Sequence, residues 1–282
     1  MFGTSTQFEN KVAIVTGGGS GIGRALCEQL ATRGSVVVVA DIDEQSAREV
    51  VSVLADRNLR AHAIRLDVSN QAEVDRIVSE TASRFGHLDY MFNNAGIAIG
   101  GDARDLSMKQ WRGVLDVDLY GVIYGALAAY SVMARQGYGH IVNTASAAGL
   151  LPQPGNLPYC TSKHAVVGLS LSLRCEGYDL GVKVSAVCPG RVETNILRSS
   201  VTMNIPREEV TARFRTVSAA KAARIILRGV SRNKAVVVFP SAIGVAWRLY
   251  RLFPSVGEII GIQMMRNLRR LRIAPPATST AE

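Results

Sequence analysis

Short, uniformly apolar runs alternate with longer segments of helical periodicity along most of the chain. Residues 11–16 form the first run, and residues 35–40 form a second one that is typical of a parallel strand covered on both faces. Further strands are predicted over 61–66, 88–92, 140–144, 182–187 and 235–239, and helices over 43–57, 71–85, 108–135, 159–179, 218–230 and the segment that ends at Gly34. This alternation predicts an α/β fold, with a doubly wound parallel sheet of seven strands and helices on both faces.

Polar and glycine residues follow several of these strands directly. Asp67, Asn94, Ser146 and Gly190 all lie where a predicted strand ends. Because right-handed crossovers bring the carboxyl ends of parallel strands to one edge, we expect a ligand-binding crevice there. No internal repeat or low-complexity linker divides the chain, so we expect a single domain over 1–282, with a core of about 8–240 and a helical C-terminal extension over 241–282.

A glycine-rich turn lies between the first strand and the first helix. In this context glycines let the backbone approach a pyrophosphate at a helix N-terminus. The candidate phosphate-binding residues are Gly17, Ser20, Gly21, Ile22 and Gly23. Asp41 follows the second strand, eighteen residues after Gly23, where a carboxylate would bind the adenosine ribose hydroxyls and repel a 2′-phosphate. The cofactor is therefore predicted to be NAD(H), with NADP(H) as the alternative.

Three side chains between residues 146 and 163 suggest acid–base chemistry. Tyr159 and Lys163 are spaced i and i+4, which places them on one face of a helix, and Ser146 precedes them across a proline-containing loop. A free phenol has a pKa of about 10, and a nearby ammonium should lower it toward the working range. The same Tyr–Lys spacing also occurs on ordinary helices, so the pair alone does not identify an enzyme.

Together the motifs resemble those of the short-chain dehydrogenase/reductase family, in its compact single-domain form, over about residues 8–240. The matching segments are the TGxxxGxG loop at 16–23, the NNAG sequence at 93–96, Ser146, the YxxxK sequence at 159–163 and the PGxxxT sequence at 189–194. The resemblance implies that Tyr159 exchanges the proton, that Lys163 lowers its pKa and contacts the nicotinamide ribose, and that Ser146 holds the substrate oxygen. It implies further cofactor contacts from Asp67, Val68, Asn94, Ala95, Gly96, Pro189, Gly190, Val192 and Thr194. For Asn94 and Thr194, hydrogen bonds that only cap loops are the alternative.

One position departs from the family pattern. Asp118 stands in the sequence VDLYG, where the family usually has asparagine in a V-N-L-x-G pattern. The family asparagine is thought to open the helix, so that its backbone carbonyl holds a water in a proton relay to the lysine. The carbonyl survives the change to aspartate, so we expect Asp118 to preserve the relay, although its carboxylate should raise the pKa of Lys163. A buried aspartate with a purely local hydrogen bond is the alternative.

Composition narrows the function further. The net charge is +9, but six arginines in the last forty-one residues account for much of it, and no basic block typical of nucleic-acid binding occurs elsewhere. The four cysteines show no C-x-x-C spacing and no metal-ligand clustering; Cys27, Cys175 and Cys188 are expected to be buried thiols. We therefore expect no metal and no nucleic acid. The chain has no signal-peptide pattern and no evident membrane span, so we expect a cytoplasmic protein.

The segments expected to cover the substrate are 150–158 and 191–215, which are rich in apolar residues. Leu151, Leu157, Ile196 and Leu197, with Ser146 and Tyr159, are the candidate substrate contacts. An apolar cleft favours a steroid-, terpenoid- or aromatic-alcohol-like secondary alcohol or its ketone. The predicted function is thus an NAD(H)-dependent alcohol dehydrogenase or ketone reductase. A non-catalytic sensor that binds dinucleotide is the alternative.

The extension after residue 240 predicts two helices, over 242–253 and 257–273, separated by Pro254. It carries Arg266, Arg269 and Arg270 together with Trp247, Tyr250 and Phe253. We expect a lid over the substrate cleft or a contact with another subunit, with attachment to a membrane surface as the alternative. The family resemblance implies a homo-oligomer, a tetramer or dimer built on the helices at 108–135 and 159–179.

Overall fold

A seven-stranded parallel sheet forms the centre of the molecule in the computed structural model, which describes residues 6–194, 201–204 and 216–272. The strands are β1 (Val12–Thr16), β2 (Val36–Asp41), β3 (Ala61–Arg65), β4 (Tyr90–Asn93), β6 (Gly139–Thr144), β7 (Val182–Pro189) and β11 (Val236–Phe239). Their order is β11-β7-β6-β4-β1-β2-β3. The chain moves outward from β1 in one direction and then from β4 in the other, so the predicted doubly wound fold is confirmed. The switch point lies between β1 and β4.

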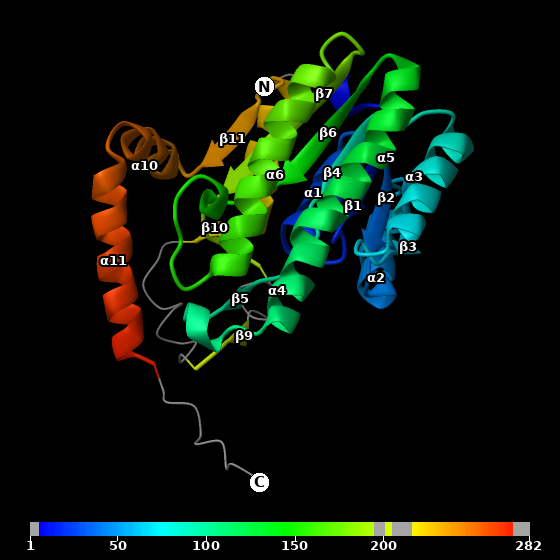
Figure 1. Cartoon of the computed structure of the whole chain (residues 1–282). Coiled ribbons are helices and arrows are strands. Elements are labelled where there is room, and N and C mark those ends of the chain that lie inside the picture. The colour runs from blue at the N-terminus through cyan, green and yellow to red at the C-terminus, as the bar shows by residue number, and fades with distance from the viewer. Residues whose placement is uncertain (1–5, 195–200, 205–215, 273–282) are drawn as a thin grey trace.

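Helices cover both faces of the sheet. Buried apolar side chains join one face to α1 (Gly21–Thr32), α2 (Glu44–Ala55) and α9 (Ala219–Ser231). The other face packs against α3 (Gln71–Phe85), α5 (Gly121–Gln136) and α6 (Leu157–Glu176), which lie side by side in Figure 1. The five inner strands are buried along nearly their whole length, which explains their apolar runs, whereas the edge strands β3 and β11 are only partly buried.

The long helix predicted over 108–135 is interrupted. It consists of α4 (Met108–Leu115), a π-helical turn η3 (Asp116–Tyr120) and α5. By length and composition residues 108–136 could cross a membrane. However, α5 packs on α3, β4 and β6, so here it serves as a covering helix of the sheet. The interruption falls on the segment that contains Asp118.

Short elements surround the carboxyl edge of the sheet. They are the two-stranded pairs β5 (Ile99–Gly100) with β9 (Val201–Thr202) and β8 (Val192–Glu193) with β10 (Val217–Ser218), and the 3-10 turns η2 (Ala103–Asp105) and η4 (Ala147–Gly149). The 3-10 turn η1 (Thr6–Phe8) precedes β1 at the opposite edge, where the Phe8 carbonyl accepts the Ser35 hydroxyl.

The C-terminal extension forms a helical hairpin at one end of the molecule. Helix α10 (Ser241–Leu252) leaves the edge strand β11, and α11 (Pro254–Arg270) turns back beside the core, as Figure 1 shows. Pro254 begins α11 instead of lying in a linker before it, because the first turn of a helix tolerates a residue without an N–H donor. The second helix therefore starts three residues earlier than predicted.

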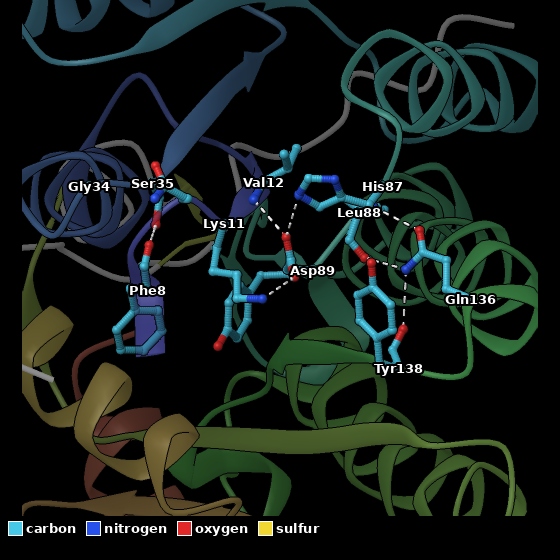
Figure 2. Close-up of polar contacts among 12 residues, drawn as sticks. Phe8, Lys11, Val12, Gly34, Ser35, His87, Leu88, Asp89, Gln136 and Tyr138 are labelled. Carbon is cyan, nitrogen blue, oxygen red and sulfur yellow. Dashed lines mark hydrogen bonds and ion pairs between the residues drawn. The ribbon is translucent and has the colours of Figure 1, made fainter. Parts of the chain in front are cut away.

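The amino-terminal edge of the sheet is fastened by polar contacts (Figure 2). The buried carboxylate of Asp89 accepts the backbone N–H of Val12 at 2.8 Å, forms an ion pair with Lys11 at 3.0 Å, and lies 3.1 Å from the Nε2 of His87. The side chain of Gln136 hydrogen-bonds both backbone polar groups of the residue before Asp89. These contacts tie β1, β4 and the end of α5 together on the edge opposite to the glycine-rich turn.

The cysteine predictions are correct for two positions and wrong for one. Cys27 and Cys188 are buried, but Cys175 is exposed near the end of α6. Cys175 lies between Arg174 and Glu176, and the helix turns its position away from the sheet.

Candidate active site

A cavity of about 400 Å³ opens at the carboxyl ends of the central strands. It lies at the switch point, where open α/β sheets bind ligands. Most of the predicted site residues line it: Gly17, Ser20, Gly21, Ile22, Asn94, Ala95, Gly96, Ser146, Tyr159, Lys163, Pro189, Gly190, Val192 and Thr194. Segments distant in sequence thus meet around one space.

The glycine-rich turn forms the end of the cavity next to α1. Gly17 and Gly21 have φ values of +63° and +52°, a conformation that favours glycine. A Cβ on Gly23 would lie 2.0 Å from the carbonyl oxygen of Gly17, so the turn can pack on the helix only without a side chain there. Ser20 is the N-cap residue of α1 but makes no side-chain capping hydrogen bond within the described residues. The first N–H groups of α1 are therefore suited to an anionic ligand, and the turn fits the pyrophosphate of a dinucleotide.

Asp41 ends β2 beside this turn. Its carboxylate accepts the backbone N–H of Gly19 at 2.9 Å and that of Asp43 at 3.0 Å. The carboxylate thus lies within hydrogen-bond distance of the glycine-rich turn, although Asp41 and Gly23 are not part of the cavity wall. This placement fits the predicted role on an adenosine ribose.

Two predicted adenine contacts are also outside the cavity wall. The side chain of Asp67 accepts hydrogen bonds from the backbone and the hydroxyl of Ser69. Val68 is buried and packs against Gly121 at the start of α5. The structure therefore places Asp67 in a local turn and Val68 in the core.

Asn94 both lines the cavity and joins two strand ends. Its backbone N–H donates to the Thr16 hydroxyl at 2.9 Å, and its side-chain amide donates to the Thr16 carbonyl at 3.1 Å. The Thr144 hydroxyl donates to its amide oxygen at 3.4 Å. Asn94 thus makes the capping hydrogen bonds that were the alternative to cofactor contact. Thr194 differs, since its methyl group lies over Gly21.

The three candidate catalytic side chains converge at the middle of the cavity. Tyr159 and Lys163 lie in the first two turns of α6, and the Lys163 Nζ is 5.3 Å from the centre of the Tyr159 ring. Ser146 follows β6 and caps η4, with its hydroxyl accepting the Ala148 N–H at 3.2 Å. The Ser146 side chain also acts on the phenol of Tyr159, whose pKa it lowers. The spacing argument for a shared helix face is confirmed by this geometry.

The prediction that the pKa of the Tyr159 phenol falls below its usual value is wrong in this structure. Burial raises the pKa of Tyr159 above its usual value, and this effect is larger than the lowering by the ammonium of Lys163; the carboxylate of Asp118 raises it further. The direction of the lysine's own effect is as predicted. Sequence spacing identified the cation but could not weigh it against burial.

Asp118 is paired with Lys163 inside the protein. Its Oδ2 lies 3.0 Å from the Lys163 Nζ, and its Oδ1 accepts the backbone N–H of Ile97 at 2.7 Å. The Lys163 Nζ also donates to the Thr144 carbonyl at 3.2 Å. Burial opposes the charge of Lys163 most strongly, yet the Asp118 carboxylate makes the pKa of that lysine higher than usual, as predicted. Burial raises the pKa of Asp118 itself.

The π-helical turn places Asp118 where it can reach Lys163. Such insertions are often found at functional sites. The aspartate is thus not limited to a local hydrogen bond, because its carboxylate contacts groups from α6 and from the loop after β4.

The apolar residues predicted to contact the substrate are not found in the cavity wall of the described residues. Leu151 packs against the core beside α6, and Leu157 begins that helix; neither lines the cavity. Ile196 and Leu197 lie outside the described residues. Instead the loop before α6 contributes Gln153, Pro154, Gly155 and Asn156, and the C-terminal extension contributes Ile243, Met264 and Leu268.

The predicted substrate contacts did not include the residues of the C-terminal extension that line the cavity. Leu268 lies against Gly155, and Met264 precedes it by one helical turn. Two ion pairs hold this part of α11 in place: Arg269 with Asp102 at 2.8 Å and Arg272 with Asp105 at 2.6 Å. The sequence predicted a lid over the substrate cleft as one role of the extension, but it did not identify Met264 and Leu268 as the residues that line the cavity.

Comparison with known proteins agrees with the geometry. Residues 11–204 match the family model described as short chain dehydrogenase. The chain is 35% identical over 190 residues to meso-2,3-butanediol dehydrogenase of Serratia marcescens, covering 67% of this chain and 74% of that protein. It is 37% identical over 195 residues to cyclohexanol dehydrogenase of Acinetobacter sp. (strain SE19), covering 68% and 77%.

A solved structure agrees as well. A short-chain dehydrogenase/reductase from Burkholderia phymatum in complex with NAD is 32% identical, has a TM-score of 0.81, and is matched over 89% of this chain and 96% of that one. The fold, the assembled motifs and these similarities lead to one assignment: this chain belongs to the short-chain dehydrogenase/reductase family.

Proposed function

We propose that the protein transfers a hydride between NAD(H) and a lipophilic secondary alcohol or its ketone. The observation that carries the proposal is the position of Ser146, Tyr159 and Lys163 in the same cavity as the glycine-rich turn. A phenol with a neighbouring ammonium and hydroxyl is equipped to exchange a proton with a substrate oxygen. The bound nicotinamide would supply or accept the hydride.

Each side chain has a distinct role in this proposal. Tyr159 takes the proton of the alcohol during oxidation and returns it to the carbonyl oxygen during reduction. Ser146 holds that oxygen and stabilises the charge that develops on it. Lys163 lowers the pKa of the phenol and contacts the nicotinamide ribose, and Asp118 fixes the lysine through their 3.0 Å ion pair.

The substrate class follows from the cavity wall and from the relatives. Pro154, Ile243, Met264 and Leu268 supply apolar surface beside the catalytic groups. Relatives named for butanediol and cyclohexanol share about a third of their residues with this chain over the matched region. Both names denote secondary alcohols, which supports a substrate of that type. Arg191 also lines the cavity, so an additional anionic group on the substrate is a second candidate feature.

Asp41 supports NAD(H) over NADP(H). Its carboxylate, held by two backbone N–H groups, would accept hydrogen bonds from ribose hydroxyls and repel a 2′-phosphate. The NAD complex of the Burkholderia phymatum relative supports this preference.

For the setting of the reaction, we propose a cytoplasmic homo-oligomer, either a tetramer or a dimer. The exposed side chains of Tyr120 at the end of η3, Leu127 on α5 and Leu171 on α6 support contacts between subunits through these helices. The rival function, a dinucleotide sensor without catalysis, is favoured only by Asp118 at the asparagine position.

The test is NADH formation, followed at 340 nm, with a panel of secondary alcohols of increasing size. The wild-type protein should reduce NAD with at least one of them, whereas Tyr159→Phe should lose about 100-fold or more in kcat because the hydroxyl proposed to exchange the proton is removed. Tyr124→Phe on α5 is the matched control and should keep full activity. Equal rates for wild type and Tyr159→Phe would contradict the proposed chemistry, and NAD binding without turnover would favour the sensor.

A further inference from the structure

The corner between α10 and α11 exposes a continuous group of large apolar side chains. Each is more than half exposed: Val245, Leu249, Leu252, Phe253, Val256, Ile259 and Ile260. We call these residues the apolar corner. Val245, Leu249 and Leu252 follow one face of α10, while Phe253 and Val256 lie at the turn that joins the helices. A group of this size on a water-facing surface indicates a binding site for an apolar partner.

The orientation of α11 is fixed by contacts on its other side. Met264 and Leu268 line the cavity, and Arg269 pairs with Asp102 beneath the helix. Rotating the helix to bury Ile259 would break these contacts, while Ile260 lies one helical turn before Met264, outside the cavity wall, and is more than half exposed. The apolar corner is therefore a stable feature of the folded chain and not a misplaced core face.

Arginines border the apolar corner. Arg248, Arg251, Arg266 and Arg270 are exposed and form no ion pair within the described residues. Arg266 and Arg270 follow Ile259 by seven and eleven positions, so they continue its face of α11. Glu258 is the only acidic residue between 241 and 272. The surface thus combines apolar side chains with a nearly unopposed positive charge.

We propose that the apolar corner docks on an anionic lipid bilayer, with its apolar side chains in the acyl boundary and the four arginines at the headgroups. Apolar burial combined with attraction to anionic lipids is the physical basis of interfacial helices. The sequence alone suggested Arg266, Arg269, Arg270, Trp247, Tyr250 and Phe253 for such a surface. In the structure Arg269 is held by Asp102, and Trp247 and Tyr250 are half-buried within the hairpin, so only Arg266, Arg270 and Phe253 of that set belong to the proposed surface.

A second copy of the chain fits the surface less well. A two-fold interface places the same patch against itself, so the arginines of two apolar corners would meet with little acidic charge to offset them. An anionic membrane offsets this charge instead.

Docking has a consequence for catalysis that rests on the proposed function. The same helix that would contact the bilayer carries Met264 and Leu268 in the cavity wall. A lipophilic alcohol dissolved in the membrane would then reach the site along α11 without crossing bulk water.

The test is sedimentation of the full-length protein with vesicles of phosphatidylcholine alone or mixed with phosphatidylglycerol. Wild-type protein should bind the mixed vesicles, less so at high salt, and bind the neutral ones weakly. The variant Phe253→Glu/Ile260→Glu should lose binding about tenfold or more, because two inserted side chains become charged. Val53→Glu on α2, which also charges an exposed apolar side chain, is the matched control and should bind as wild type does.

A second variant separates charge from apolar contact. Replacing Arg248, Arg251, Arg266 and Arg270 by glutamine should abolish the preference for anionic vesicles. Failure of wild type to bind mixed vesicles, or unchanged binding by Phe253→Glu/Ile260→Glu, overturns the proposal. A fall in the molar mass of that variant by light scattering, without vesicle binding by wild type, would assign the corner to a second copy. Activity toward a soluble alcohol should be unchanged in both variants, so failure of the proposed function would be seen separately, as absent turnover with intact vesicle binding.

Discussion

At the scale of single residues, the site depends on Asp118, a buried aspartate at a position where the family usually has asparagine. The Asp118 carboxylate holds Lys163 and at the same time raises the pKa of the Tyr159 phenol. These effects oppose each other, since the lysine favours the phenolate that oxidation requires and the aspartate disfavours it.

Asp118→Asn should therefore shift the pH dependence of alcohol oxidation. Oxidation needs deprotonated Tyr159, so its rate rises with pH through the phenol pKa. Removing the carboxylate lowers that pKa, and the rising limb of kcat/KM against pH should move to lower pH, with the high-pH plateau changed by less than about threefold. Asp116→Asn, an exposed position in the same π-helical turn, is the control. A much higher plateau in Asp118→Asn would show that the aspartate impairs the site.

Under the proposed function, one side chain would also decide the choice between NAD and NADP. Asp41→Ser removes the charge that would repel a 2′-phosphate, so the ratio of kcat/KM for NAD to that for NADP should fall about tenfold or more. Asp43→Ser, which changes the N-cap residue of α2 two positions later, is the control and should leave the ratio near the wild-type value. An unchanged ratio in Asp41→Ser would remove the basis for the predicted NAD preference.

At the scale of elements, α11 closes the cavity through a pair of charged contacts. The hydrogen bonds from Arg104 and Arg269 keep the pKa of Asp102 below its usual value, and the bond from Arg272 does the same for Asp105. Because the folded-state pKa values are lowered, these contacts stabilise the fold above the usual aspartate pKa and are lost only as the pH falls through the lowered values.

Arg269→Ala/Arg272→Ala should loosen α11 without unfolding the core. Met264 and Leu268 would lose their fixed position in the cavity wall, so KM for a bulky alcohol should rise several-fold while kcat changes little. Arg104→Ala removes the other partner of Asp102 and leaves α11 untouched, so it is the matched control. An equal KM for both variants would mean that the helix does not shape the substrate site.

At the scale of the whole molecule, the two edges of the sheet have different roles. Ligand-binding loops occupy its carboxyl edge, and the contacts of Asp89 fasten the opposite edge. Stability and chemistry are thus separated along the strands.

Asp89→Ala should destabilise the protein by about 1–3 kcal/mol, because it leaves the buried N–H of Val12 without its acceptor. Urea unfolding measures this, with catalytic rates at low denaturant unchanged. Glu80→Ala, which breaks an exposed ion pair with Arg76, should cost less than about 1 kcal/mol. Equal midpoints for the two variants would show that the Asp89 contacts do not stabilise the sheet.

The amino-acid sequence alone determined what depends on neighbours along the chain. The pattern of apolar residues predicted the α/β fold with its parallel sheet, and the glycines at 17–23 predicted the turn before α1. The i, i+4 spacing predicted that Tyr159 and Lys163 share one helix face. The tertiary structure decided what depends on distant partners: the ion pair of Asp118 with Lys163, the raised pKa of a buried phenol, and the position of Leu268 over the cavity. The physical reason is that hydrogen-bonded periodicity is local, whereas burial and charge pairing are set by residues that only the packed fold brings together.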